Sequence, residues 1–159
     1  MEYSVTPIGT VHNGRTDIAA TDYWGDVPST IVVDERFGVD CMLGLSEFSH
    51  ADIVFLFHET TERDDYRPRR PRGRADLPEV GVFADRGPRR PNRIGVTTCR
   101  IVSVHGRHLR VSGLDAVGGT PVVDIKPTMA EFQPSEVRQP AWVERLMTDY
   151  FRSADGSPK

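Results

Sequence analysis

The segment DIVFLFH, residues 52–58, is almost entirely apolar and rich in residues that favour β-structure. A short run of this kind predicts a strand that is buried in the core. It is the best core candidate in the chain, and we expect the other elements to pack around it.

Further strand-like segments lie on both sides of this run, at residues 3–11, 29–37, 79–84, 96–104, 107–113 and 120–127. His105-Gly106 separates two of them and predicts a tight hairpin turn. Only the tail repeats apolar residues at helical spacing, over residues 140–152. Six or seven strands, one helix and no alternation of the two predict an all-β or β-rich α+β fold, a small closed or partly open β-barrel with a C-terminal helix.

The length of 159 residues fits one domain. We assign residues 1–135 to the barrel and residues 136–159 to the C-terminal helix and tail. Within the barrel domain, residues 60–78 are polar and contain three prolines and one glycine. Such a composition cannot bury enough apolar surface to fold alone, so we expect a mobile loop that becomes ordered when substrate binds.

The cysteines and the motif search point to a reduced, cytoplasmic protein. Cys41 and Cys99 are too few for a disulfide framework and lack CxxC spacing, and Cys99 is expected to pack in a strand. No apolar run approaches the ~20 residues of a membrane span, and the N-terminus does not resemble a signal peptide. Because P-loop, GxGxxG and HExxH motifs are also missing, we expect no membrane contact and no metal.

Positive charge is concentrated in one part of the sequence. The net charge is −3, yet ten of the 20 Lys and Arg residues are arginines within residues 63–93, a range that holds five acidic residues. A basic patch on an acidic body attracts an anionic partner without making the whole surface adhesive. The plainer interpretation is a solvated loop that is kept for solubility.

The stretch FADRGPRRPNRIGVTT, residues 83–98, holds part of this charge on stiff backbone. Pro88 and Pro91 fix their φ angles, and Asn92 can bond its own backbone. Guanidinium groups presented in this way suit phosphates, which position a nucleic acid without reading its sequence. The residues expected to contact such a substrate are Arg69, Arg70, Arg72, Arg89, Arg90, Asn92 and Arg93.

Three longer segments carry a family resemblance: GLSEFSHADIVFLFH (44–58), GVFADRGPRRPNRIGVTTCRI (81–101) and GLDAVGGTPVVDIKP (113–127). Together with PIGTV near the N-terminus, they resemble the TsaA-like family. The resemblance implies a β-barrel methyltransferase that uses S-adenosylmethionine to methylate N6 of threonylcarbamoyladenosine in the tRNA anticodon loop. It also implies a homodimer with the cofactor near the subunit boundary.

The resemblance further implies which residues bind the cofactor: His58, Glu59, Arg86, Val96, Leu114, Asp115, Ala116 and Val117. The family's early PRQ triplet is missing, and the corresponding residues 22–25 are DYWG. There, Tyr23 or Trp24 could offer a ring for the adenine. The chain also departs from the family motifs at Asp85, Gly87, Arg93, Gly118 and Thr128.

Methyl transfer from a sulfonium requires donor and acceptor to be held in line. A carbamoylated N6 is a poor nucleophile because its lone pair is delocalised, so a base would help. The candidates are Asp115, His58, Asp124 and Lys126, and spacing does not distinguish them. Asp124 and Lys126 share one strand face, where a plain ion pair is the simpler interpretation.

Two of the expected cofactor contacts, Arg86 and Asp115, have specific candidate roles. Arg86 could hold the methionine carboxylate through a bidentate contact. Asp115 could bind the ribose hydroxyls or the amino group of the donor, or could instead cap the turn at Gly118-Gly119.

The leading hypothesis is therefore a methyltransferase that acts on tRNA. A second hypothesis keeps the cofactor and methylates a small nucleoside or metabolite. A third, from another class, is a non-catalytic module that binds the cofactor or RNA.

Overall fold

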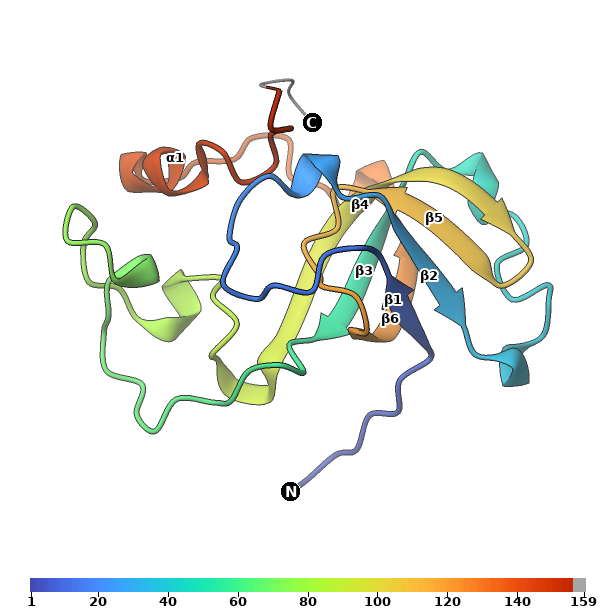
Figure 1. The fold of residues 1–159 in the computed structure, drawn as a ribbon, viewed down its shortest axis with the longest axis horizontal. Helices are drawn as coiled ribbons and strands as arrows, with labels where there is room; N and C mark the ends of the chain where they lie inside the picture. The colour runs from blue at the N-terminus through green and yellow to red at the C-terminus, as the bar shows by residue number, and fades with distance from the viewer. Residues whose placement is uncertain (156–159) are drawn as a thin grey trace.

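The computed structural model describes residues 1–155, and its strands close into a barrel (Figure 1). Within these residues the strands are β1 (Gly9–His12), β2 (Ser29–Val33), β3 (His50–Leu56), β4 (Ile94–His105), β5 (His108–Ser112) and β6 (Pro121–Pro127). The neighbours are antiparallel in the order β1-β2-β5-β4-β3-β6, and β6 pairs back onto β1. The predicted small β-barrel is confirmed, with six strands in the described part of the chain.

Strand β3 lies between β4 and β6 and supplies the centre of the core. Ala51, Ile53 and Phe55 are at most 1% exposed. The residues between them are only half-buried, because a barrel wall has one interior face and alternate side chains point outward. The rest of the barrel interior is formed mainly by Val11, Ile31, Cys99, Leu109, Val111 and Val122.

Two predicted strands are shorter than expected. β1 begins at Gly9, where an added Cβ would lie 2.5 Å from the Val32 carbonyl oxygen of the neighbouring strand. β2 ends at Val33, because Asp34 accepts a hydrogen bond from the Arg36 N–H and caps a 3-10 turn, η2 (Glu35–Phe37).

The prediction of a strand over residues 79–84 was wrong. Val80 forms one isolated antiparallel bridge with Arg69, and Val82–Ala84 form the 3-10 turn η5. The six strands already close the barrel on themselves, so they leave no free edge to which this segment could pair.

The predicted hairpin is confirmed between β4 and β5. His105 pairs with His108, which leaves Gly106 and Arg107 as a two-residue loop. Gly106 has a φ of +54°, in the left-handed region that such a turn requires and that glycine adopts without strain.

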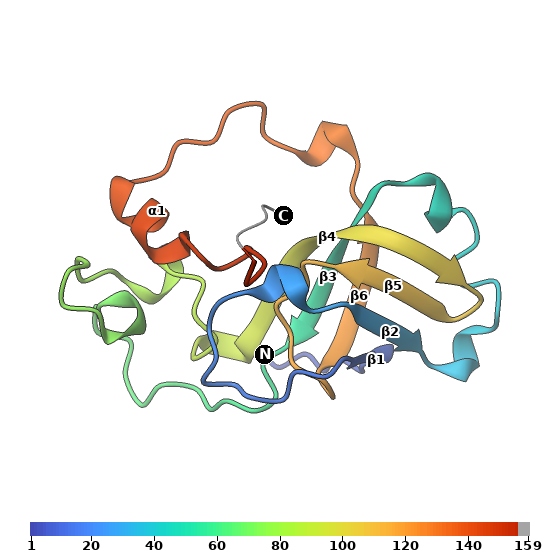
Figure 2. The same cartoon turned by 45° about the horizontal axis from the view of Figure 1, so that its top comes forward.

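A second layer lies beside one end of the barrel (Figures 1 and 2). It contains the segment between β3 and β4, with the 3-10 turn η4 (Pro71–Gly73), and helix α1 (Ala141–Met147). Arg74 donates a hydrogen bond to the Arg145 carbonyl oxygen at 3.2 Å, and Arg145 donates one to the Asp76 carbonyl oxygen at 3.4 Å. Leu77 is 1% exposed. The expected mobility of residues 60–78 stays a prediction.

The C-terminal helix is present but shorter than the predicted 140–152. It ends at Met147, and the Thr148 hydroxyl donates to the Glu144 carbonyl oxygen, a bond that competes with the backbone ladder. The predicted tail includes residues 156–159, which lie outside the described residues. Within residues 1–155, no helix is long and apolar enough to cross a membrane.

Candidate cofactor site at one end of the barrel

The segments that hold most of the predicted cofactor contacts are connected to strands at the same end of the barrel. Leu56, the last residue of β3, pairs with Ile94, the first of β4. β6 begins beside them, since Val122 pairs with Phe55. The segment after β3, the segment before β4 and the β5–β6 loop therefore leave the barrel at the same end.

Asp115 lies in the β5–β6 loop, and both of its carboxylate oxygens are hydrogen-bonded. Oδ1 accepts a bond from the hydroxyl of Thr97, an inward-facing residue of β4. Oδ2 accepts a bond from the Tyr150 hydroxyl at 2.6 Å. A carboxylate has about four acceptor positions, so Asp115 is oriented by the chain and can still bind a ligand hydroxyl or amino group.

Tyr150 comes from the C-terminal segment, and the sequence did not indicate its contact with Asp115. Burial, and then the neighbouring Asp115 carboxylate, raise the pKa of its hydroxyl. The hydroxyl therefore keeps its proton and remains a donor to Asp115. The Arg72 guanidinium lies 5.5 Å from the centre of the Tyr150 ring and, at 3.1 Å, pairs with Asp22.

The DYWG segment is held against the same C-terminal residues. The Tyr23 N–H donates to the Asp149 carbonyl oxygen and the Trp24 N–H to the Tyr150 carbonyl oxygen, both at 2.9 Å. Trp24 is only 5% exposed, and the Arg15 guanidinium lies 3.7 Å from the centre of its ring. Tyr23 is 44% exposed, so of the two rings it is the one available to a ligand.

Arg86 and Val96 contact each other beside this group. An Arg86 Nη donates to the Val96 carbonyl oxygen at 2.5 Å, and the Val96 side chain is 43% exposed. Arg86 also lies near enough to Tyr150 to oppose the rise of its pKa. Arg86 thus lies near Tyr150, the partner of Asp115, whereas the Val96 side chain is on the outward face of β4, opposite to Thr97.

Two of the three neighbours of Asp115 that were expected to bind the cofactor have side chains too deeply buried to contact it. Leu114 is 0% exposed and Ala116 is 2% exposed, so both side chains belong to the core. Val117 is half-buried. The Ala116 carbonyl oxygen accepts a hydrogen bond from the Asn13 side chain, which fixes this loop to the residues after β1.

The side chains of His58 and Glu59 contact each other at the exit of β3. His58 Nε2 lies 3.2 Å from Glu59 Oε1, and 27% of the His58 side chain is exposed. A Cβ added to Gly119, which has a φ of +88°, would lie 3.8 Å from His58 Nε2. His58 therefore lies at the β5–β6 loop, the loop that carries Asp115.

The structure does not place Asp124 and Lys126 beside Asp115. They form an ion pair with an N–O distance of 2.5 Å on β6, where their side chains are partly or fully exposed. Asp124 is in register with Val54, which in turn is in register with Val96, so it lies on the outward face of the barrel. Thr97, which holds Asp115, points to the interior.

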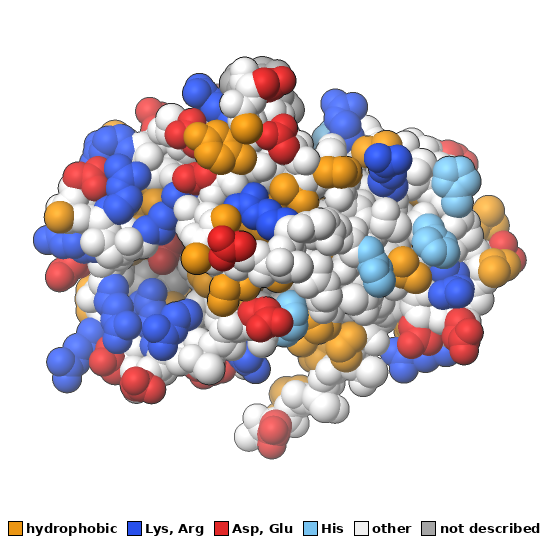
Figure 3. All heavy atoms as spheres, viewed as in Figure 1, with side chains coloured by type: hydrophobic (Ala, Val, Ile, Leu, Met, Phe, Trp, Pro, Cys, Tyr) orange, Lys and Arg blue, Asp and Glu red, His pale blue; other side chains and the backbone are white. Residues whose placement is uncertain are grey.

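Lys and Arg side chains gather over the second layer, with acidic side chains among them (Figure 3). Many of the predicted substrate contacts are engaged within the chain. Arg70, Arg90 and Arg93 donate to the carbonyl oxygens of Leu77, Asp85 and Thr60, respectively. Arg69 pairs with Asp65, and Arg72 with Asp22. The Asn92 N–H donates to Glu62.

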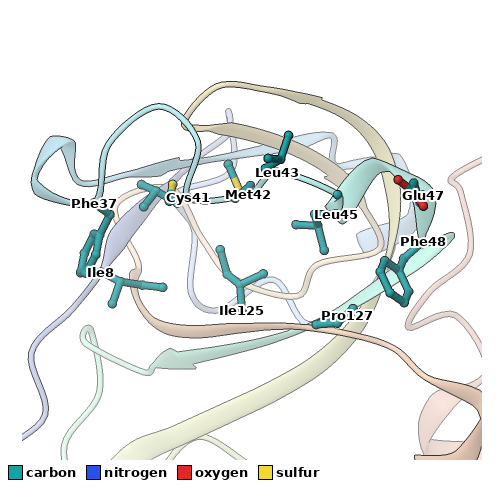
Figure 4. Close-up of a pocket in the computed structure, with 12 residues that line it drawn as sticks. Ile8, Phe37, Cys41, Met42, Leu43, Leu45, Glu47, Phe48, Ile125 and Pro127 are labelled. Carbon is teal, nitrogen blue, oxygen red and sulfur yellow. The ribbon is translucent and has the colours of Figure 1, made fainter.

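An apolar pocket of about 490 Å³ lies elsewhere, under the loop between β2 and β3 (Figure 4). Phe37, Met42, Leu43 and Phe48 of this loop line it together with Ile125. None of the site residues predicted from the sequence is among the described residues that line this pocket.

Comparisons with known proteins agree with the predicted family. The profile of the tRNA-methyltransferase O N-terminal domain matches residues 18–133. The human tRNA (adenine(37)-N6)-methyltransferase is 40% identical over 100 residues, which are 62% of this chain and 22% of that protein. A "Probable S-adenosyl-L-methionine-binding protein" from Methanothermobacter thermautotrophicus is 36% identical over 130 residues, 80% of this chain and 90% of that protein.

The fold comparison points the same way. The crystal structure of TrmO from Pseudomonas aeruginosa matches with a TM-score of 0.72 and 29% identity, and the match covers 89% of this chain and 62% of that one. This chain spans about a fifth of the length of the human relative. The sequence match over residues 18–133 and the shared barrel show that the chain belongs to the tRNA-methyltransferase O N-terminal domain family.

Proposed function

We propose that this chain methylates N6 of threonylcarbamoyladenosine at position 37 of tRNA, with S-adenosylmethionine as the methyl donor. The observation that carries this proposal is that Arg86 and Asp115 both lie beside Tyr150 at one end of the barrel. Family membership and the name of the human relative support the reaction and the nucleotide. The name of the Methanothermobacter relative supports the cofactor.

The residues at this end of the barrel fit the cofactor chemically. The Asp115 carboxylate suits ribose hydroxyls or an ammonium group, and the Arg86 guanidinium suits a carboxylate. The exposed ring of Tyr23 suits an adenine. When bound, the sulfonium supplies an activated methyl group, so the chain has to orient the two reactants and accept one proton.

We assign proton acceptance to His58. Asp124 and Lys126 pair with each other on the outward face, and the Asp115 carboxylate is held by two hydroxyl groups. His58 Nε2 faces Glu59, which orients the ring and leaves the lone pair on Nδ1. Nδ1 would then accept the proton that N6 loses when it gains the methyl group.

The outward arginines would hold the tRNA through its phosphates. Arg89 is exposed, and within residues 1–155 its guanidinium forms no hydrogen bond or ion pair. Arg69 can exchange its exposed partner Asp65 for phosphate, and Arg72 its half-buried partner Asp22. Arg70, Arg90 and Arg93 donate to backbone carbonyl groups and would instead stabilise the conformation of the loops that form this surface.

The test is incubation with a labelled methyl donor and tRNA that does or does not carry the threonylcarbamoyl group. We expect label only in the modified tRNA. His58→Ala should lower turnover by about 10²-fold or more if His58 is the base. His105→Ala removes an exposed imidazole at the β4–β5 turn and should retain wild-type turnover.

Other outcomes would redirect the proposal. Several arginines are bonded within the chain and are therefore not free to bind tRNA phosphates. A small methyl acceptor is thus the second candidate, and it gains support if a modified nucleoside is labelled and tRNA is not. Cofactor binding without any labelled acceptor would favour a non-catalytic module. The homodimer expected from the family resemblance and the cytoplasmic location expected from the sequence also remain predictions.

A further inference from the structure

The C-terminal segment touches the proposed cofactor site although it follows the barrel in sequence. Tyr150 donates to the Asp115 carboxylate at 2.6 Å, a contact that joins positions 35 residues apart. Its ring packs edge-on against Phe151, with 4.8 Å between the ring centres. The hydroxyl is therefore aimed at Asp115 by the packing of its own segment.

The Tyr150 hydroxyl is suited to orient a carboxylate and not to exchange protons with it. Burial and Asp115 raise its pKa, so it stays protonated. Hydrogen bonds to a charged acceptor are stronger than neutral ones and fix the direction of the acceptor lone pairs. The second donor, Thr97, comes from the barrel wall, so one carboxylate is held from two separate parts of the fold.

The same segment also positions the residues expected at the adenine. The carbonyl oxygens of Asp149 and Tyr150 accept the N–H groups of Tyr23 and Trp24. The Ala154 N–H donates to the Asp26 carboxylate at 2.5 Å. Residues 22–26 and 149–154 thus run side by side as one unit.

We propose that Tyr150 is a positioning residue for the cofactor, which holds the Asp115 carboxylate through its hydroxyl while its backbone holds Trp24. The C-terminal segment completes the cofactor site from outside the barrel. This inference rests on the proposed function, because it assumes that Asp115 contacts S-adenosylmethionine.

Calorimetric titration of the full chain with S-adenosylmethionine tests this inference. Tyr150→Phe keeps the ring and removes the hydroxyl, and should weaken binding roughly tenfold, as expected for one hydrogen bond to a charged group. Asp115→Ala should weaken binding more. Adding Tyr150→Phe to Asp115→Ala should then have little further effect, because the two groups act through one contact.

Tyr66→Phe is the matched control, since the exposed Tyr66 hydroxyl also donates to a carboxylate, that of Glu62, at 3.0 Å. It should bind the cofactor as the wild type does. If Tyr150→Phe unfolds the chain, Thr97→Val removes the other donor to Asp115, with Thr98→Val, which faces Asp52, as its control.

Two results would overturn the role of Tyr150 and leave the proposed function intact: wild-type affinity in Tyr150→Phe, or independent losses that multiply in the double variant. If the wild-type chain bound no cofactor, the proposed function would fail together with this inference.

Discussion

The pairing of residues 22–26 with the C-terminal segment can be broken by one methyl group. A Cβ on Gly25 would lie 2.5 Å from the Phe151 carbonyl oxygen and 3.1 Å from the Arg152 carbonyl carbon, where ordinary contact begins at 3.4 Å. Both neighbours are backbone atoms, so rotation of a side chain cannot relieve the clash. Gly25→Ala therefore requires the two backbones to separate by about 0.9 Å, the difference between 2.5 and 3.4 Å.

A separation of that size affects the bonds on either side. The two backbone hydrogen bonds from Tyr23 and Trp24 are 2.9 Å long, and lengthening by nearly 1 Å takes them beyond bonding distance. Each is worth about 1 kcal/mol net. Overpacking alone typically costs about 1–3 kcal/mol. Separation of the backbones relieves the clash at the expense of the two hydrogen bonds, so the two costs are alternatives and are not added. We expect the free energy of unfolding to fall by about 2 kcal/mol.

Urea unfolding measures this change, and limited proteolysis reports whether the C-terminal segment is released. Gly14→Ala is the control, because no atom lies within 4 Å of its added Cβ and its φ is not in the left-handed region. It should be neutral or slightly stabilising. If Gly25→Ala matched Gly14→Ala in both stability and protease resistance, the two segments would not pair as described.

Two further predictions concern charge and pH. Arg89→Ala should lower the slope of the logarithm of the tRNA-binding constant against the logarithm of salt concentration by about one unit. Arg110→Ala, on the exposed face of β5, should leave this slope unchanged. If a filter-binding series gave equal slopes for the two variants, Arg89 would not lie in the interface. The pKa of Tyr150 is raised above its ordinary value of 10.0, so below pH 10 its full contribution to stability is present. As the pH rises above 10, the unfolded chain loses this proton before the folded chain does, and stability falls. Tyr150→Phe should weaken that fall and Tyr3→Phe should not, as measured by urea unfolding between pH 8 and about pH 11.

The barrel could be predicted because its signals are local. The apolar run at β3 and the glycine of the β4–β5 turn each follow from a few neighbouring residues. The strand predicted over residues 79–84 failed for a non-local reason, since the closed barrel has no edge left to pair with it. The propensity to form a strand depends on the residues of one segment, whereas closure of the barrel depends on how all six strands pair.

The candidate site likewise contains residues that the sequence indicated and others that it did not. The family motifs indicated Arg86, Val96 and Asp115, and of these Arg86 and Asp115 lie beside Tyr150, whereas the Val96 side chain is on the outward face of β4. Tyr150 gave no such signal, because it continues the helical spacing of apolar residues and should have faced a core. Arginine content predicted a basic surface but not the direction of any guanidinium group, and Arg70, Arg90 and Arg93 turned toward backbone carbonyl groups.

The boundary that we assigned at residue 135, between the barrel and the C-terminal helix and tail, therefore separates parts of the chain that contact each other. Arg72, from the segment between β3 and β4, pairs with Asp22 and lies against the Tyr150 ring, so it touches both halves of the unit formed by residues 22–26 and 149–154. An anion that drew Arg72 away would remove contacts from both halves at once. The arginine-rich surface and the Asp115 site are thus joined through the C-terminal segment, and their energetics should be measured together.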